Sequence, residues 1–323
     1  MSHKFFVFPG QGSQYPGMGK DWYENFQEAR ESFEEASDFT GLNLKKLCFE
    51  GSEAELRATE VTQPAILCTT VAIFRSLQID KQGLYAGHSL GEYSALVCSG
   101  ALDLGPAARL VKNRGRYMQE AVPAGKGAMA ALVFRPKTDG TEKADALCRE
   151  VSALGHGYVS VANYNTPEQI VISGEADAVK AASDRALLAP FDARKVVPLN
   201  VSAPFHCRLM KPAAQRLTAE LQSAPWMSSK LSYIANVDAT TYALDKDLAA
   251  VAARLIHQVD HSVLWTQSLV EALRLDARRL VEVGPSAVLT GMAKRVTLND
   301  VGFEALNIDR VEDFKNVEAQ LGT

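Results

Sequence analysis

The sequence has few cysteines and no segment that resembles a disulfide or zinc framework. Its five cysteines are scattered over 323 residues, and none of them forms a C-x-x-C pair. Such usage predicts a reducing compartment, without disulfides and without a structural metal ion. The apolar run at residues 5–8 is too short for a signal peptide, and no apolar stretch approaches the length of a membrane span. We therefore expect a cytoplasmic protein that binds no membrane and no metal.

The sequence also lacks an excess of positive charge. It has 34 Lys and Arg against 38 Asp and Glu, for a net charge of −4, which argues against a nucleic-acid partner. The glycine-rich stretch Gly10–Gly12 has no Walker lysine, and Tyr15 stands where G-x-G-x-x-G needs its third glycine. We therefore expect neither a phosphate-binding loop nor a bound cofactor.

The apolar pattern of the first 120 residues predicts alternating strands and helices. Residues 5–8 are continuously apolar and run into the glycine-rich loop, which is typical of a parallel strand buried on both faces. Gln63-Pro64 is predicted to open a helix, because proline is tolerated in a first turn. Alternation continues with a strand at 84–86 and helices near 21–37, 93–100 and 106–120. This order predicts an α/β domain built on a parallel sheet.

The order of predicted elements changes after Pro123-Ala124-Gly125. The pattern gives β-α-β-β-α-β, with strands at 129–134, 158–163, 169–173 and 195–199 and helices at 142–154 and 176–188. That order is typical of a ferredoxin-like unit. We expect residues 126–199 to form this small subdomain, inserted into a large domain made of residues 1–125 and 200–323.

A G-x-S-x-G motif is present as Gly87, Ser89 and Gly91, between a predicted strand and a predicted helix. In enzymes this motif forms a sharp turn that presents the serine hydroxyl, and the glycines leave room for neighbouring backbone. The helix N-terminus beside it offers N–H groups to a developing oxyanion. A serine at such a place can also be a simple helix cap. The residues alone support a nucleophile and a cap about equally.

A serine nucleophile needs a general base, and His206 is the best candidate among the six histidines. It lies in the predicted loop Val201-Ser202-Ala203-Pro204-Phe205-His206, and loops carry function more often than helix faces do. His257 ranks next, although its helical stretch favours a surface or packing role. A triad would add a carboxylate, for which Asp238 and Asp260 are weak candidates. A backbone carbonyl or an amide is the alternative.

Three arginines follow the serine motif within about one further helix, namely Arg109, Arg114 and Arg116. A guanidinium binds a carboxylate through two parallel hydrogen bonds. An arginine near the serine would therefore select an acyl group that carries a free carboxylate. A solvated surface position is the ordinary alternative for each of them, and spacing alone does not choose among the three.

The chain resembles the malonyl-coenzyme A:acyl carrier protein transacylase family over nearly its whole length. Eight ordered motifs carry the resemblance: Phe8-Pro9-Gly10-Gln11-Gly12-Ser13-Gln14, Thr62-Gln63-Pro64-Ala65, Gly87-His88-Ser89-Leu90-Gly91-Glu92-Tyr93, Asn113-Arg114-Gly115-Arg116-Tyr117-Met118-Gln119, Gly127-Ala128-Met129-Ala130-Ala131, Asn163-Tyr164-Asn165 with Gln169-Ile170-Val171-Ile172-Ser173-Gly174, Ser202-Ala203-Pro204-Phe205-His206, and Gly284-Pro285 with Leu289-Thr290-Gly291-Met292. The resemblance implies an α/β-hydrolase-like core with a ferredoxin-like insertion, which agrees with the predicted order of elements.

The resemblance also implies catalytic roles. Ser89 would take the acyl group from coenzyme A as an ester, and His206 would be its general base. The backbone N–H groups of Gln11 and Leu90 would form the oxyanion hole. Gln258 matches the position whose backbone carbonyl orients the histidine in the family, which would explain the missing triad acid.

The implied substrate contacts come from four further residues. Arg114 would bind the free carboxylate of malonyl, and Gln63 and Asn163 would line the acyl and pantetheine cleft. Phe205 stands where many fatty-acid-synthesis members have a small residue, and the Ala-Pro-Phe-His form looks more like malonyl-selective acyltransferases of polyketide assembly lines. A bulky ring there would disfavour an α-methyl branch.

The function that this resemblance implies is malonyl transfer from malonyl-CoA to the phosphopantetheine thiol of an acyl carrier protein. We expect a free-standing monomer that needs no cofactor, because phosphopantetheine is carried by the partner, and that acts in polyketide synthesis. Housekeeping fatty-acid synthesis is the first alternative. An editing acyl hydrolase is a less favoured one, because Arg114 would not suit acyl chains that lack a carboxylate. A non-catalytic carrier-docking subunit would not need the serine, histidine and arginine.

Overall fold

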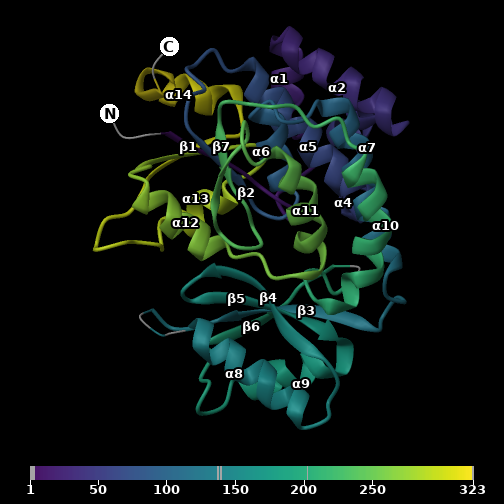
Figure 1. Cartoon of the computed structure of the whole chain (residues 1–323), viewed down its shortest axis with the longest axis vertical. Helices are drawn as coiled ribbons and strands as arrows, with labels where there is room; N and C mark the ends of the chain where they lie inside the picture. The colour runs from purple at the N-terminus through teal and green to yellow at the C-terminus, as the bar shows by residue number, and fades with distance from the viewer. Residues whose placement is uncertain (1–3, 137, 139, 202, 322–323) are drawn as a thin grey trace.

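The computed structural model describes residues 4–136, 138, 140–201 and 203–321, which form two sheets with helices packed around them. In Figure 1 the six-stranded sheet and most helices fill the upper part of the molecule. The four-stranded sheet lies below it, with α8 (Gly140–Ala153) and α9 (Ala176–Ala186) at the bottom. This is the predicted α/β class, with a mostly parallel sheet and a separate antiparallel one.

The large sheet has the strand order β10-β9-β1-β2-β7-β8. All neighbours pair in parallel except β7 and β8. The strands are β1 (Lys4–Phe8), β2 (Leu84–Gly87), β7 (Ser232–Ile234), β8 (Thr241–Ala243), β9 (Arg279–Val283) and β10 (Glu304–Ile308). Parallel strands bring their carboxyl ends to one edge of a sheet, where open α/β sheets bind ligands. The loops after β1, β2, β7 and β9 therefore meet at one edge.

Strand β1 is buried on both faces, as its apolar run predicts. Phe6 and Phe8 belong to the main core cluster, which includes α5 (Thr59–Ser76) and α7 (Leu104–Glu120). Phe5 and Val7 point to the opposite face and join a second cluster with Trp265. Alternating side chains of one strand thus anchor two helical layers, which is what a central parallel strand requires.

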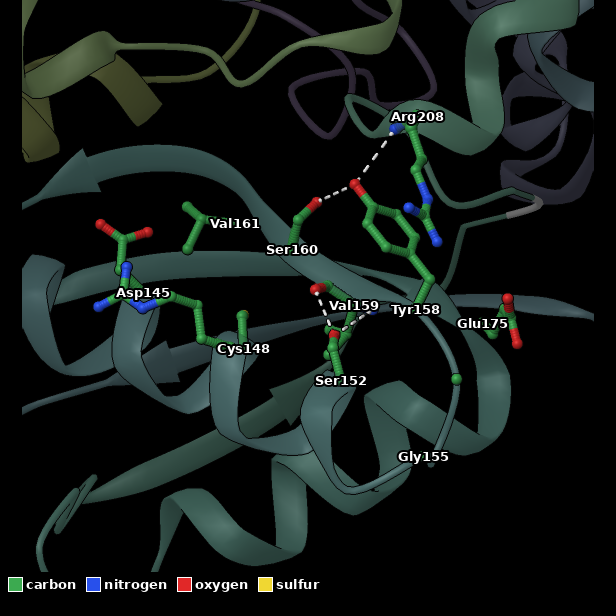
Figure 2. Close-up of a pocket in the computed structure, with 12 residues that line it drawn as sticks. Asp145, Cys148, Ser152, Gly155, Tyr158, Val159, Ser160, Val161, Glu175 and Arg208 are labelled. Carbon is green, nitrogen blue, oxygen red and sulfur yellow. Dashed lines mark hydrogen bonds between the residues drawn. The ribbon is translucent and has the colours of Figure 1, made fainter.

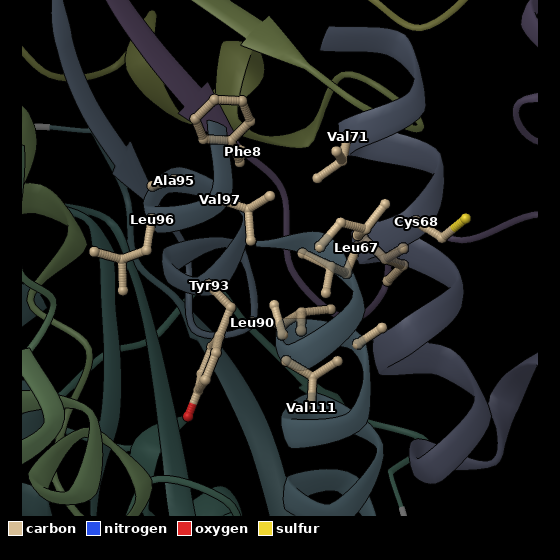
Figure 3. Packing of buried hydrophobic residues seen from close by; sticks show 14 of the residues in the cluster. Phe8, Leu67, Cys68, Val71, Leu90, Tyr93, Ala95, Leu96, Val97 and Val111 are labelled. Atoms are coloured by element: carbon tan, nitrogen blue, oxygen red, sulfur yellow. The ribbon is translucent and has the colours of Figure 1, made fainter. Parts of the chain in front are cut away.

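Helices cover both faces of the large sheet. Figure 3 shows side chains of Leu90, Tyr93 and Val97 packing beside Leu67 of α5 and Val111 of α7. The turn at the serine motif therefore rests on a rigid apolar base. The remaining helices of this part are α1 (Lys20–Asn25), α2 (Gln27–Thr40), α3 (Leu44–Glu50), α4 (Glu53–Arg57), α6 (Gly91–Cys98), α10 (Lys211–Gln222), α11 (Val251–Asp260), α12 (Trp265–Arg274), α13 (Val288–Ala293) and α14 (Val311–Leu321).

Two helix boundaries differ from the sequence prediction. Helix α5 begins at Thr59, so Pro64 lies inside it and does not open it. An internal proline removes one helix hydrogen bond, but nearly every side chain of α5 is buried and packing outweighs that loss. The helix predicted over 21–37 is two helices, because Phe26 between them is extended, with φ −126° and ψ 138°.

The small sheet is antiparallel throughout and has the order β4-β5-β3-β6. Its strands are β3 (Gly127–Val133), β4 (Val159–Thr166), β5 (Gln169–Glu175) and β6 (Lys195–Pro198). With α8 after β3 and α9 after β5, the element order is βαββαβ, the predicted ferredoxin-like arrangement. These strands run from Gly127 to Pro198, within the predicted subdomain of residues 126–199.

Three further properties of the described residues concern membrane spans, metal ions and cysteines. No helix in the described ranges has both the length and the apolar character needed to cross a bilayer. Within those same ranges, no group of three or more His, Cys, Asp or Glu side chains could hold a metal ion. All five cysteines are free, and Cys98 is the one that is not fully buried.

Candidate active site

The G-x-S-x-G motif forms the turn from β2 into α6, as predicted. A Cβ placed on Gly87 would lie 1.9 Å from the carbonyl oxygen of Gly91, so only glycine fits this close approach. Ser89 has φ 53°, in the left-handed region that side-chain-bearing residues rarely adopt. Its N–H donates to Asn236 Oδ1 at 2.7 Å, and its carbonyl accepts from Gln258 Nε2 at 2.8 Å. Two amides therefore hold the serine in a strained conformation.

His206 is the histidine that reaches the serine. Its Nε2 lies 2.7 Å from Ser89 Oγ, and its Nδ1 lies 2.9 Å from the backbone carbonyl oxygen of Gln258. A carbonyl oxygen only accepts, so Nδ1 carries the ring proton and Nε2 accepts from the serine hydroxyl. That is the tautomer of a general base. The orienting acceptor is thus a carbonyl and not the carboxylate of Asp238 or Asp260.

The surroundings of His206 keep its ring neutral. The residue is 4% exposed. Burial, together with the positive charge of Arg114, lowers the pKa of His206 to about 3. A neutral imidazole at physiological pH can accept the serine proton directly, so the resting site is in the protonation state that nucleophilic attack needs.

Arg114 is buried, and its hydrogen-bond partners are neutral groups. It is 1% exposed, and Nη1 donates to Gln63 Oε1 at 2.9 Å. Nη2 donates to Gln258 Oε1 at 2.8 Å and to Ser89 Oγ at 3.1 Å. The guanidinium lies over the Tyr93 ring, and burial lowers the pKa of the arginine. A buried cation without a carboxylate partner is costly, so this site favours an incoming anion.

A cavity of about 100 Å³ opens in front of these groups. Among the residues that the structure describes, the backbone N–H groups of Gln11 and Leu90 have no acceptor, and both residues line this cavity. Unpaired N–H groups beside a nucleophile are suited to bind an oxyanion. The lining residues are Gln11, Gln63, His88, Ser89, Leu90, Arg114, Met118, Met129, Asn163, Leu199, Val201, Phe205 and His206.

The three predicted substrate contacts besides Arg114 also line this cavity, whereas Gln258 does not line it and contacts His206 through its backbone carbonyl. Gln63 and Phe205 line it from the large domain, and Asn163 of β4 lines it from the small sheet. Phe205 is 7% exposed and therefore packs as part of the wall. Ser202 of the same loop lies outside the described residues.

Two buried polar residues of the site were not found from the sequence. Asn236 donates from Nδ2 to the Gly87 carbonyl at 2.7 Å, and Glu92 accepts from Gln258 Nε2 at 2.9 Å. Asn236 follows β7 at the same sheet edge as Ser89, which is a usable signal in hindsight. Glu92 stands inside the recognised motif, but its sequence position does not reveal that it is buried.

The rival candidates lie elsewhere. His257 stacks on His261 with ring centroids 5.3 Å apart, and Asp260 pairs with His261 at 2.7 Å. Arg109 lines a separate hollow, and Arg116 lies over the ring of the neighbouring tyrosine at 5.3 Å. None of these residues lines the cavity at the serine. His88 does line it, but its Nε2 contacts Asn165, so His206 and Arg114 are the histidine and the arginine that reach Ser89 Oγ.

A second hollow, of about 580 Å³, lies on the small sheet and is shown in Figure 2. Arg208 covers the ring of Tyr158 at 3.8 Å, and the Tyr158 hydroxyl donates to Ser160 Oγ at 2.9 Å. Asp145 and Glu175 add negative charge to the same rim. None of the predicted site residues lines this hollow, and its mixed charges favour no single ligand.

Comparison with known proteins gives consistent results. The profile of the family described as acyl transferase domain matches residues 5–315. A malonyl CoA-acyl carrier protein transacylase of Salmonella typhimurium is 42% identical over 302 residues, covering 92% of this chain and 93% of the relative. The transacylase of Bacillus subtilis strain 168 is 39% identical over 300 residues, covering 92% of this chain and 91% of the relative.

Solved structures agree in fold along the whole chain. The malonyl CoA-acyl carrier protein transacylase of Clostridium perfringens has a TM-score of 0.89 at 35% identity, covering 99% of this chain and 97% of that one. A malonyl-transacylase solved in complex with its type II polyketide synthase acyl-carrier protein has a TM-score of 0.90 at 39% identity, covering 99% of this chain and 100% of that one.

Proposed function

The chain belongs to the acyl transferase family and transfers malonyl from malonyl-CoA to an acyl carrier protein, and we propose that Ser89 holds the malonyl group in between. The observation that carries this proposal is the contact of Ser89 Oγ with His206 Nε2 at 2.7 Å beside a buried Arg114. A nucleophile, its base and an anion site thus meet in one cavity.

The first half-reaction follows from these contacts. His206 Nε2 takes the hydroxyl proton while Ser89 Oγ attacks the thioester carbonyl carbon. The negative charge on the carbonyl oxygen is received by the N–H groups of Gln11 and Leu90. The carbon–sulfur bond then breaks, and the coenzyme A sulfur receives from His206 the proton that came from Ser89. Malonyl-Ser89 and free coenzyme A thiol result.

The second half-reaction runs the same steps in reverse with a different thiol. His206 removes the proton from the phosphopantetheine thiol of the carrier, and the sulfur attacks the ester carbonyl of malonyl-Ser89. Oγ leaves and regains the proton. Exchange of a thioester for an ester and back changes little in energy, so positioning decides the outcome and water must be kept out. The protein adds no cofactor of its own in this scheme.

Arg114 accounts for malonyl selection. Gln63 and Gln258 hold its guanidinium through amide oxygens, which leaves its charge for the malonyl carboxylate. A neutral acyl group would leave this buried charge unpaired, which is the strongest form of discrimination open to a small pocket. Asn163 and Gln63 line the same cavity, and we propose that they contact the acyl group and the pantetheine arm.

The experiment that tests this function is brief incubation with malonyl-CoA followed by peptide mass spectrometry. We expect a malonyl increment on the peptide that contains Ser89, and its loss when carrier protein is added. An increment on another residue, or none at all, contradicts the mechanism. Release of malonate to water faster than transfer to carrier would favour an editing hydrolase instead.

The pathway is a finer proposal. We propose a role in polyketide synthesis, supported by the resemblance of Ala203-Pro204-Phe205-His206 to malonyl-selective acyltransferases of polyketide assembly lines. The Phe205 ring lines the cavity and would exclude an α-methyl branch. Housekeeping fatty-acid synthesis fits the relatives equally well. Loading of methylmalonyl by the Phe205→Ser variant tests the steric part, because an unchanged malonyl-to-methylmalonyl ratio would remove the support that Phe205 gives.

Two further proposals concern the state of the protein. We propose that it is a monomer, which light scattering of the purified chain tests directly; a dimer mass would contradict it.

We also propose that it acts in the cytoplasm, supported by five free cysteines, four of them buried. Recovery of the activity outside the cytoplasmic fraction of its host would contradict this location.

A further inference from the structure

A buried carboxyl group lies directly behind the catalytic groups and contacts none of the cavity. Glu92, in the first turn of α6, is 1% exposed and does not line the cavity. Its Oε2 accepts two hydrogen bonds, from Gln258 Nε2 at 2.9 Å and from the Asn236 N–H at 3.2 Å. Its Oε1 has no partner. The mechanism above makes no use of this group.

The Gln258 amide has one orientation that satisfies all of its neighbours. Its Nε2 faces two acceptors, Glu92 Oε2 and the Ser89 carbonyl oxygen, and its Oε1 faces the Nη2 donor of Arg114 at 2.8 Å. Rotation of the amide by 180° would set an oxygen against two oxygens and an NH₂ group against a cation. Glu92 is therefore one of the two acceptors that fix which end of Gln258 meets Arg114.

The second bond to Glu92 leads to the nucleophile. Glu92 Oε2 accepts from the backbone of Asn236, whose side chain accepts from the Ser89 N–H at 2.7 Å and donates to the Gly87 carbonyl at 2.7 Å. One carboxyl oxygen thus supports both the amide that holds the arginine and the amide that holds the serine turn.

We propose that Glu92 is a positioning residue for malonyl selection, acting through the Gln258 amide to set the place of the Arg114 guanidinium; this rests on the proposed role of Arg114. Without the Glu92 acceptor, the amide can turn away and the guanidinium loses a partner that fixes it. Malonyl then loses more than a neutral acyl group does, because only malonyl uses the arginine.

The role assigned to Glu92 is that of a hydrogen-bond acceptor and not of a charge. Burial raises the pKa of Glu92 to about 7, so its neutral form is accessible at neutral pH. A single oxygen carries both bonds, and the amide oxygen of glutamine can do the same. The acceptor and the charge can therefore be separated by substitution.

The test compares Glu92→Gln with Glu92→Asp. E92Q keeps the reach and removes the charge, whereas E92D keeps the charge and is one methylene too short for the Gln258 amide. The readout is the ratio of malonyl to acetyl loading on Ser89, which does not depend on the folded fraction of a preparation. We expect the ratio to fall about tenfold in E92D, as a lost buried hydrogen bond would produce, and to stay within about twofold of wild type in E92Q. If E92D does not fold, Glu92→Met can replace it, because it removes the acceptor at similar volume. It should lower the ratio of malonyl to acetyl loading in the same way.

Glu282 provides a matched control, because it is equally buried but caps α13 through the N–H groups of Leu289 and Thr290. Glu282→Asp should lower stability and leave the ratio unchanged. An unchanged ratio in E92D overturns the proposal, as does an equal fall in E92Q or in the Glu282 control. A wild-type protein that loads no malonyl on Ser89 would instead overturn the proposed function itself.

Discussion

The two sheets differ in what they bury. The carboxyl edge of the large sheet encloses Glu92, Arg114 and His206, none of them more than 4% exposed. The core between the small sheet and its helices is apolar throughout, with Leu132, Ile172 and their neighbours. Buried ionisable groups are costly unless the surroundings fix them. The large sheet therefore carries the chemistry, and the small sheet acts as a wall that closes the cavity.

The backbone shows the same difference. Ser89 and His206 both have positive φ, at 53° and 56°. Strain of this kind persists only where the surrounding structure over-determines it, and here two amides and a carbonyl do so. The small sheet contributes two cavity residues, Met129 of β3 and Asn163 of β4, and neither has a positive φ. The two residues that react thus have left-handed backbone conformations, whereas the two strand residues that enclose the cavity do not.

The comparison is sharpest for two serines, the half-buried Ser89 at the cavity and the buried Ser173 of the small sheet. We expect Ser89→Ala to lower malonyl loading by about 10³-fold or more, because Ser89 carries the one hydroxyl or thiol among the described residues that line the cavity. Ser173 of the small sheet is fully buried and does not line the cavity. Ser173→Ala should leave loading within about twofold. Rapid-quench measurement of acyl-enzyme checks both, and comparable losses would contradict the division of labour between the sheets.

The next largest difference in loading is expected between two arginines, Arg114 at the cavity and Arg185 on the small domain. Arg114→Ala should lower malonyl loading by about 10²-fold and relax selectivity towards acetyl, because the carboxylate loses its only buried cation. Arg114→Lys should give malonyl loading between that of wild type and that of Arg114→Ala, since an ammonium cannot bind a carboxylate bidentately.

Arg185, on the small domain, pairs with Glu150 at 2.7 Å and serves as the matched control. Arg185→Ala should leave selectivity unchanged. Competition between malonyl-CoA and acetyl-CoA, read by mass on Ser89, is the measurement. Unchanged selectivity in Arg114→Ala would remove its assigned role.

The buried histidine should couple stability to pH. In the folded state the pKa of His206 is about 3, below its ordinary value of 6.5. Between these values the unfolded chain binds a proton that the folded chain does not, so the free energy of unfolding falls as pH falls. This dependence is at most about 1.4 kcal/mol per pH unit.

His206→Gln should flatten that dependence between pH 6.5 and 4 relative to wild type, as urea unfolding at each pH would show. His156→Gln, on an exposed turn, serves as the control and should leave the slope as it is. Parallel curves for wild type and His206→Gln would mean that His206 is not held neutral.

The smallest expected effect lies where the two regions meet. His88, beside the nucleophile, donates from Nε2 to Asn165 Oδ1 of the small sheet at 2.9 Å. Asn165→Leu would leave a buried N–H unpaired and should cost about 1–3 kcal/mol of stability. Malonyl loading per folded molecule should change little.

Equilibrium unfolding measures this loss, and Asn165→Asp, which keeps an acceptor, should recover most of it. A large change in loading would show that the small sheet positions the nucleophile and does not merely enclose it.

Local patterns in the sequence predicted much of the fold. The apolar run of β1, the glycines around Ser89 and the βαββαβ order all depend on neighbours close in the chain, and the structure confirms them. Prediction failed where distant packing overrides local preference. Pro64 lies inside α5 because the whole helix is buried, and Phe26 splits a helix whose apolar spacing continues across it.

The sequence by itself determined the reactive turn and the set of candidate partners, through spacing and motif. The family resemblance pointed to His206 and Arg114 among those partners, but only the tertiary structure gave a physical reason for that choice. Arg114 lies on the same helix as Arg109 and Arg116, yet it alone lines the cavity, and His206 lies 2.7 Å from Ser89 Oγ although 117 positions separate them in the chain. The burial of Glu92 and the contacts of Asn236 were likewise visible only in the tertiary structure. The physical reason is that burial, hydrogen bonding and pKa depend on what distant segments bring against a side chain, and no window of neighbouring residues contains that information.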